Sequence, residues 1–386
     1  MKRRDLLKVS LGAITLALPF RNLKAGAVSN ESVLDFIRSE IAAGNFPGSG
    51  LLVYQNGKLL MEDYQGTYCD GQTRDARMGA DVVNRLFSFS KGISATIVVM
   101  AHQKGLIDYD APLATYIPSY RGGWKDGTTI RHLLTHTAGI PNCELGTVLT
   151  EETWQRALEV CAACTVEWEP GSRSVYHARS AMFLAAEAVR SRIPGRPSWE
   201  SICREWLFEP LGADSLTFAL PTKGPLALTP QPKKLPTTIA QQKSNLGQPG
   251  SGCFGRLSDV IKVLQLHLNG GTWDGKVLIK PEAWAEMHRI QYRSEILQAQ
   301  TRKETAAYEP FGLGWKLKLN QTGDWFGLGN RTAEGAFGHA GIDTVIGVGI
   351  PQKNLAIAFA TTGSPPKPHV SRIRNTITDM VAALSS

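Results

Sequence analysis

Two residues one helical turn apart, Ser88 and Lys91, form an S-x-x-K pattern. They precede an apolar run, residues 93–101, that ends in Gln103-Lys104-Gly105, a typical helix C-terminus. A serine hydroxyl is a weak nucleophile until a neighbouring base takes its proton, and lysine is such a base where this spacing is catalytic. A helix N-terminus and partial burial would both lower the pKa of the lysine. The pattern alone also fits a helix-capping serine beside a solvated lysine. Motifs elsewhere in the chain are therefore needed to distinguish a catalytic pair from this alternative.

The elements that position this pattern begin with a predicted helix at residues 32–43. Two apolar runs follow, 48–55 and 58–65, on either side of Asn56-Gly57. Because Asn-Gly tolerates the positive φ angles of a type I′ turn, these runs predict a β-hairpin.

A second hairpin is predicted near the C-terminus, from residues 344–350 and 355–361, and a helix follows at 369–384. Strands at both ends with helices between them favour one antiparallel sheet built from both termini, with a helical part packed on it. The predicted class is therefore α+β, an α/β sandwich. We expect one catalytic unit over 28–386, with an α/β part (28–87 and 306–386) and a helical part (88–305).

Residues 220–252 are polar and turn-forming, without periodicity. The stretch is too long for a plain connector inside a compact domain. It is interpreted as a loop on the substrate side rather than as a domain boundary.

The composition limits the classes of partner. With 386 residues, 42% of them hydrophobic, the chain can bury one large core or two medium ones. The net charge is +8, but six basic residues and one acidic residue give +5 of it before residue 28. The remainder is too weakly basic for a nucleic-acid footprint, and no RNA-binding motif occurs, so nucleic acid is not expected as a partner.

The N-terminus has the features of an export signal. A charged start, Lys2-Arg3-Arg4, is followed by an apolar run, 9–20, and by Ala25-Gly26-Ala27, an A-x-A cleavage pattern. The paired arginines resemble a twin-arginine signal, although Lys2 stands where Ser or Thr is usual. An uncut anchoring helix is the alternative, but the run is too short to span a bilayer. We expect residues 1–27 to be removed and the protein to be periplasmic or secreted, without a stable membrane span.

Six cysteines are too few and too scattered for a disulfide framework in a chain of this length. Cys161 and Cys164 form a CxxC, but it lies within a predicted helix at 153–164 and lacks a second Cys/His pair nearby. Structural packing is favoured over a metal or redox role. No metal or cofactor is expected.

Further motifs follow S-x-x-K in a fixed order. The motifs are GLIDYD (105–110), TIRHLLTHTAG (129–139), WEPGS (168–172) before Tyr176, PLG (210–212), GSG (250–252) with Ser258-Asp259, FGLGW (311–315) and GHAG (338–341). By these motifs the chain resembles the serine β-lactamase and penicillin-binding-protein-like family, in its class C β-lactamase and family VIII esterase branch. The resemblance covers nearly all of the chain after residue 27 and implies the β-lactamase/transpeptidase-like fold.

The resemblance implies that Ser88 is the nucleophile and Lys91 its proton acceptor. It also implies that Tyr176 shares the base role and later gives a proton to the leaving group. A tyrosine at its usual pKa of about 10 is a poor base, but a lysine ammonium stabilises its phenolate. The three side chains must therefore meet in space. The alternative for Tyr176 is a core aromatic residue with a satisfied hydroxyl.

The third family motif falls on His339, Ala340 and Gly341, on a strand expected to edge the site. A side chain at Gly341 would block a substrate lying along that strand. The resemblance implies an oxyanion hole made by the backbone N–H groups of Ser88 and Ile342. His339 is expected to line the same cleft, although a satisfied strand histidine is the alternative. His132 and His136 are expected to have structural roles in the middle motif.

Two departures from the family pattern bear on the substrate. The second motif of the lactamases is Tyr-x-Asn, and here Ala178 stands where that asparagine would bind an amide carbonyl. The third motif often has lysine, which holds a substrate carboxylate, and here it has His339. Both changes favour an esterase, or a hydrolase of unusual amides, over an efficient β-lactamase. The resemblance therefore implies a serine hydrolase that acts through an acyl-enzyme on a small-molecule or peptide-like ester or amide, most readily as an esterase. The alternatives are a DD-peptidase or D-amino-acid peptidase, a true β-lactamase, and a catalytically dead ligand sensor. The natural substrate and the oligomeric state stay open.

Overall fold

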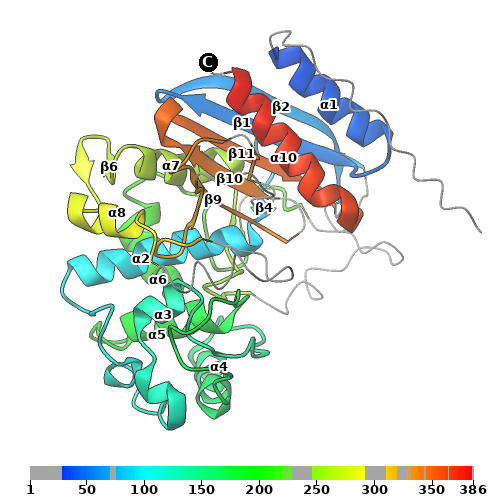
Figure 1. Ribbon diagram of the computed structural model, residues 1–386. Helices are drawn as coiled ribbons and strands as arrows, with labels where there is room; N and C mark the ends of the chain where they lie inside the picture. Colours follow the sequence, from blue (N-terminus) through cyan, green and yellow to red (C-terminus); the bar gives the residue numbers. More distant parts are fainter. Residues whose placement is uncertain are drawn as a thin grey trace, which may run out of the picture.

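The computed structural model shows one large sheet with helices on both faces (Figure 1). It describes residues 28–69, 75–222, 224–227, 246–291, 310–319, 328–330, 332–342, 345–363 and 365–384. The predicted export signal, 1–27, lies outside the described residues, as does most of the predicted substrate-side loop.

The sheet has seven strands in the order β3-β2-β1-β11-β10-β9-β8, and neighbouring strands run antiparallel. Strand β1 pairs with β11, so the hairpins from the two ends of the chain share one sheet, as predicted. The turn between β1 and β2 has positive φ at both Asn56 (51°) and Gly57 (73°), as expected for a type I′ turn. The strands are β1 (Gly48–Gln55), β2 (Lys58–Tyr68), β3 (Ala76–Arg77), β8 (Lys316–Leu317), β9 (Phe337–Ala340), β10 (Ile346–Ile350) and β11 (Leu355–Thr361).

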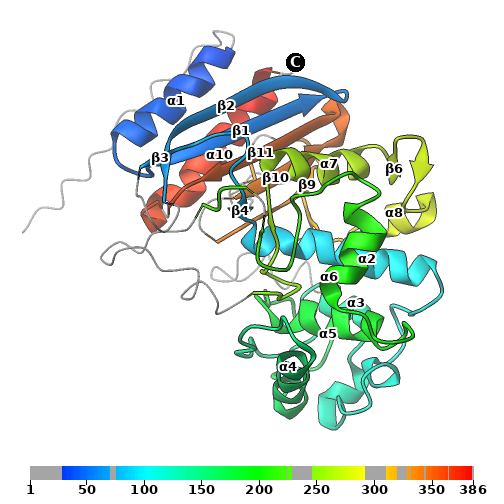
Figure 2. The ribbon, with the colours of Figure 1, turned by 180° about the vertical axis from the view of Figure 1, so that it is seen from behind.

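The sequence of β11, LAIAFAT, alternates large and small side chains, and this divides the two faces of the sheet. The large ones, such as Ile357 and Phe359, pack with α1 (Asn30–Ala42) and α10 (Lys367–Leu384) in one hydrophobic cluster. Both side chains are fully buried, which stabilises the fold by roughly 2–3 kcal/mol each. The alanines face the other cluster, where α7 (Leu257–Leu268) lies on the sheet (Figure 2).

Helix α2 (Ser90–Gln103) lies between the sheet and the helices of residues 130–203 (Figure 1), and its residues from Ser90 to Ala101 are all buried. A helix that is apolar on all sides belongs in the core of a large domain, and α2 contacts β9, α5, α6 and α8. The range expected to be helical also contains α7, which packs on the sheet. The other elements are α3 (Ile130–Leu134), α4 (Glu151–Ala163), α5 (Ser180–Arg190), α6 (Trp199–Cys203), α8 (Pro281–Met287) and the short strands β4 (Asn84–Arg85), β5 (Phe254–Gly255), β6 (Thr272–Trp273) and β7 (Lys276–Val277).

The two cysteines of the CxxC pair have different environments. Cys161 is buried and free, in agreement with the packing role, whereas Cys164 forms a disulfide with Cys143. The sequence did not predict this single disulfide, which closes a loop of modest length rather than building a framework.

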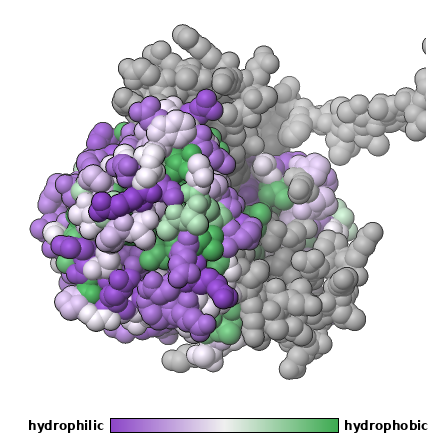
Figure 3. Space-filling model, turned by 90° about the horizontal axis from the view of Figure 1, so that it is seen from below, coloured by the Kyte–Doolittle hydropathy of each residue, from purple (hydrophilic) through white to green (hydrophobic). Residues whose placement is uncertain are grey.

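The surface at the helical end carries small hydrophobic areas between hydrophilic residues (Figure 3). Among the described residues, no helix combines the length and apolarity that a bilayer crossing requires.

Candidate active site

Ser88 lies in a short 3₁₀ turn, Phe87–Phe89, which leads directly into α2. The preceding Phe87 has a φ of 45°, a left-handed conformation that costs a non-glycine residue on the order of 1–3 kcal/mol. Such strain persists only where the surroundings hold it, and here the buried ring of Phe89 lies against Gly347 of β10. A Cβ at Gly347 would come within 2.2 Å of that ring. The turn is thus pinned to the sheet while Ser88 stays partly accessible.

Lys91 is fully buried one turn after Ser88. Its Nζ donates to Ser88 Oγ at 3.2 Å and to the carbonyl oxygen of Gly250 at 2.8 Å. The second bond comes from the end of the predicted substrate-side loop, so this part of the loop borders the site. These two hydrogen bonds fix the position of Lys91 Nζ beside Ser88 Oγ.

Tyr176 reaches the same atom from the other side. Its hydroxyl donates to Ser88 Oγ at 2.8 Å, and Lys91 Nζ lies 4.9 Å from the centre of its ring. The ring of His136 packs against it at 4.8 Å, and His136 Nδ1 accepts a hydrogen bond from the backbone N–H of His177. The structure therefore brings Ser88, Lys91 and Tyr176 together, and His136 supports the tyrosine. His132 instead belongs to the N-terminal capping box of α3.

His339 lies on β9, with its ring 6.0 Å from that of Tyr176. It is 1% exposed and its Nδ1 contacts the carbonyl oxygen of Ala340 at 3.0 Å. Burial lowers its pKa well below the usual value, and the ammonium groups of Lys316 and Lys91 lower it further. A neutral His339 cannot supply the positive charge of the lysine that it replaces.

Gly341 and Ile342 follow β9 directly. A Cβ at Gly341 would sit 3.0 Å from the carbonyl oxygen of Leu86 and from Phe87 Cβ, so the absence of a side chain lets this backbone approach the turn that carries Ser88. The side chain of Ile342 is 73% exposed. The proposed oxyanion donor therefore lies in a segment packed beside the nucleophile turn.

The chain is similar to known proteins over most of its length. The sequence model of the Beta-lactamase family matches residues 33–378. The chain belongs to the Beta-lactamase family. The family predicted from the ordered motifs is thereby confirmed.

Two relatives and one solved structure are similar to this chain. The esterase/β-lactamase LipL of Mycobacterium tuberculosis is 29% identical over 196 residues, which cover 51% of this chain and 42% of LipL. The D-alanyl-D-alanine-carboxypeptidase/endopeptidase AmpH of Escherichia coli K12 is 23% identical over 362 residues, 88% of this chain and 85% of AmpH. A family VIII carboxylesterase of known structure superimposes with a TM-score of 0.71 at 22% identity, covering 93% of this chain and 98% of that one. The likeness in structure confirms the predicted fold. The match to LipL spans about two-fifths of the length of LipL.

In this member of the Beta-lactamase family, sequence reasoning missed two buried basic residues near the site. Lys316 of β8 is 5% exposed, and its Nζ lies 5.5 Å from the centre of the Tyr176 ring. Arg374 of α10 is 7% exposed and donates to the carbonyl oxygens of Gly341 and Ile342. A basic residue directly after the FGLGW motif was the available signal for Lys316. No comparable signal in the sequence marked Arg374, because it is one of several charged residues on α10.

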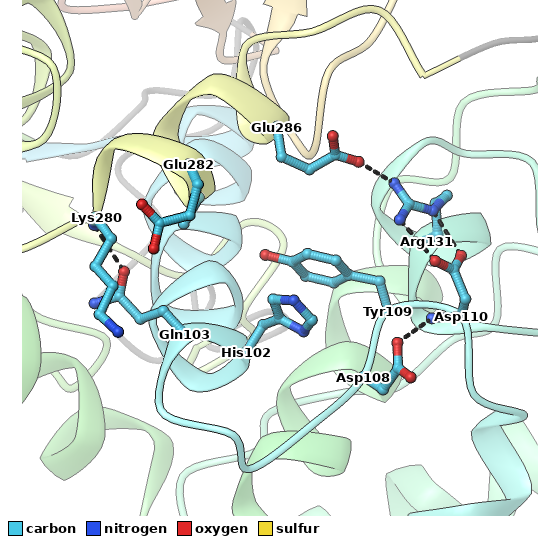
Figure 4. Close-up of a pocket in the computed structure, with 10 residues that line it drawn as sticks. His102, Gln103, Asp108, Tyr109, Asp110, Arg131, Lys280, Glu282 and Glu286 are labelled. Atoms are coloured by element: carbon cyan, nitrogen blue, oxygen red, sulfur yellow. Dashed lines mark hydrogen bonds and ion pairs between the residues drawn. The ribbon is translucent and has the colours of Figure 1, made fainter.

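A cavity of about 310 Å³ lies at the opposite end of α2 and is not part of this site (Figure 4). Its lining includes His102, Tyr109 and Arg131, and Arg131 pairs with Asp110 and Glu286. The 14 residues of α2 separate the cavity from Ser88 by roughly 20 Å. No group of His, Cys, Asp or Glu within the described ranges is arranged to hold a metal.

Proposed function

We propose that this chain is a serine hydrolase that cleaves esters through an acyl-enzyme on Ser88. One observation carries the proposal: Ser88 Oγ is hydrogen-bonded to both Lys91 Nζ and Tyr176 Oη, at 3.2 and 2.8 Å. A hydroxyl between two groups that can exchange protons with it meets the requirement for an activated nucleophile.

The proposed reaction has two similar halves. Lys91 or Tyr176, in its deprotonated form, takes the Ser88 proton as Oγ bonds to the ester carbonyl carbon. The carbonyl electron pair moves onto oxygen, where the backbone N–H groups of Ser88 and Ile342 stabilise it. The carbon–alkoxide bond then breaks, and the alcohol leaves with a proton from Tyr176. Water repeats the attack on the acyl group, which releases a carboxylic acid and restores the Ser88 hydroxyl.

Two residues support an ester rather than an acylamino-carboxylate substrate. Ala178 offers no side-chain amide to hold a substrate carbonyl. His339 is buried and its pKa is well below the usual value, chiefly because of burial, so it offers no charge to hold a carboxylate. The contacts that an esterase requires at Ser88 do not depend on either position.

A DD-peptidase is the second candidate, and Lys316 favours it. This lysine lies on β8, next to β9, and its ammonium group is close to Tyr176 and His339. A cation there would restore the carboxylate recognition that the third motif lacks. AmpH, which is similar over most of both chains, bears a carboxypeptidase name.

We also propose that the protein is exported. The basic and apolar pattern of residues 1–27 supports a twin-arginine-like signal, and a periplasmic or secreted hydrolase follows from it.

The test compares the wild-type protein with Ser88→Ala on p-nitrophenyl butyrate, nitrocefin and a D-Ala-D-Ala peptide. We expect ester turnover that Ser88→Ala abolishes, with slow nitrocefin hydrolysis. Turnover confined to the peptide would replace the esterase by the DD-peptidase, and turnover confined to nitrocefin would indicate a β-lactamase. A stoichiometric adduct on Ser88 without turnover would indicate a ligand sensor, and Ser88-independent turnover would refute the proposal.

A further inference from the structure

Arg374 links the C-terminal helix to the backbone beside the nucleophile. It lies on α10 and is buried, and its guanidinium donates to the carbonyl oxygen of Gly341 and, at 3.3 Å, to that of Ile342. Arg374 follows Gly341 by 33 positions along the chain. One buried cation thus binds two successive carbonyl groups directly after β9.

Because the peptide bond is planar, the contact with Arg374 also fixes the direction of the Ile342 N–H. The carbonyl of Gly341 and the N–H of Ile342 belong to one peptide unit, which is trans. In a trans peptide the C=O and N–H bonds point in opposite directions. A guanidinium that holds the Gly341 oxygen toward α10 therefore directs the Ile342 N–H away from α10.

The other side of the same segment is fixed by the nucleophile turn. Gly341 approaches Leu86 and Phe87 so closely that a Cβ would lie 3.0 Å from both. The Gly341 N–H also donates to the carbonyl oxygen of Val345 at 2.6 Å, which closes the connection to β10. The peptide is therefore held between Arg374 on one side and the residues preceding Ser88 on the other.

We propose that Arg374 is the positioning residue of the oxyanion hole: it orients the Gly341–Ile342 peptide and strengthens its N–H as a donor. The inference rests on the proposed function, which uses the Ile342 N–H to hold the oxyanion. A hydrogen bond from a charged donor is roughly twice as strong as a neutral one, and it polarises the amide to which it is made. The positive charge of Arg374 acts on the oxyanion through this peptide and need not touch the substrate.

A purely structural role for Arg374 predicts a different outcome. If the arginine only fastened α10 to the sheet, its loss would lower the melting temperature and leave the chemistry of the folded enzyme unchanged. Arg372 is a matched control, because it lies on the same helix and forms an ion pair with the buried Glu40 of α1, at 2.8 and 2.7 Å. It anchors α10 through α1 rather than through residues 341–342.

The experiment measures kcat and KM on p-nitrophenyl butyrate, the affinity for phenylboronic acid and the melting temperature. The full chain is compared with Arg374→Met, Arg374→Lys and Arg372→Met. Removing an oxyanion donor outright costs about 10²–10³ in kcat, so losing its orientation should cost about 10- to 100-fold. We expect Arg374→Met to lower kcat by this factor with KM within about threefold. Phenylboronic acid, which forms a tetrahedral adduct on serine, should bind correspondingly more weakly.

The two remaining variants separate positioning from folding. Arg374→Lys keeps a charged donor and should recover part of the lost kcat, and it serves as the test if Arg374→Met does not fold. Arg372→Met should lower the melting temperature and leave kcat within about threefold of wild type. Unchanged kcat and boronate affinity in folded Arg374 variants would overturn the inference and leave the proposed function intact. Failure of the wild-type protein to form an acyl-enzyme would overturn both.

Discussion

Replacing Gly347 of β10 by alanine tests how the sheet positions the nucleophile. A Cβ there would lie 2.2 Å from the Phe89 ring. To reach an ordinary contact of 3.4 Å, either the ring or the strand must move by roughly 1.2 Å. Phe89 directly follows Ser88, and both belong to the same 3₁₀ turn. A misplacement of about 1 Å can cost on the order of 10²-fold in rate, so we expect Gly347→Ala to lower kcat about 100-fold.

Gly349→Ala is the matched control on the same strand and the same face. Its Cβ would lie 2.3 Å from the ring of Phe337, so the overpacking is of similar severity but falls on a residue of β9 rather than on the nucleophile turn. Overpacking of this kind costs about 1–3 kcal/mol of stability in either variant. We expect comparable falls in melting temperature, with kcat of Gly349→Ala within about threefold of wild type.

The assay follows p-nitrophenyl butyrate hydrolysis well below the melting temperature, with the folded fraction of each variant taken from circular dichroism. We expect the two variants to lose similar stability and very different amounts of activity. Equal losses of kcat in both, or a destabilised Gly347→Ala enzyme with normal kcat, would show that the contact with Phe89 does not position Ser88.

Three further predictions concern protons and charge. Tyr176→Phe removes the hydroxyl that lies 2.8 Å from Ser88 Oγ, and it should lower kcat about 10²- to 10⁴-fold with little change in melting temperature. A normal kcat would exclude Tyr176 from proton transfer. Burial lowers the pKa of His177 to about 4 and of His288 to about 3. Below pH of about 6.5 the unfolded chain therefore binds protons that the folded chain does not, and each histidine should remove about 1.4 kcal/mol of stability per pH unit. Urea midpoints should fall from pH 7 to pH 5, and a constant midpoint would contradict this. Lys316→Met removes one of the charges that lower the pKa of His339. The pKa of His339 should therefore rise in an NMR titration, although burial still holds it below the usual value. An unchanged His339 pKa would show that Lys316 does not act on His339.

Local signals in the sequence predicted much of the fold. The Asn56-Gly57 turn depends on neighbouring residues only, and the structure has this turn where it was predicted. The Gln103-Lys104-Gly105 end of α2 is equally local, and Gly105 has the positive φ of 72° expected after a helix. Joining the two hairpins into one sheet followed from the order of strands and helices.

The candidate site was only partly predictable. Ser88 and Lys91 are neighbours on one helical turn, so their contact follows from spacing, whereas Tyr176 lies 88 residues away and was assigned through the family resemblance. Arg372 and Arg374 are two residues apart on α10, and periodicity does not tell which of two charged residues turns toward β9. The Cys143–Cys164 disulfide was missed for a similar reason, because connectivity depends on folded distances.

Mass spectrometry of the protein, mixed rapidly with p-nitrophenyl butyrate and quenched in acid, tests whether Ser88 carries the acyl group. We expect a butyryl group on the peptide that contains Ser88, formed at the rate of p-nitrophenol release and absent from Ser88→Ala. Ester hydrolysis without an adduct on any residue, or with the butyryl group on another side chain, would contradict it.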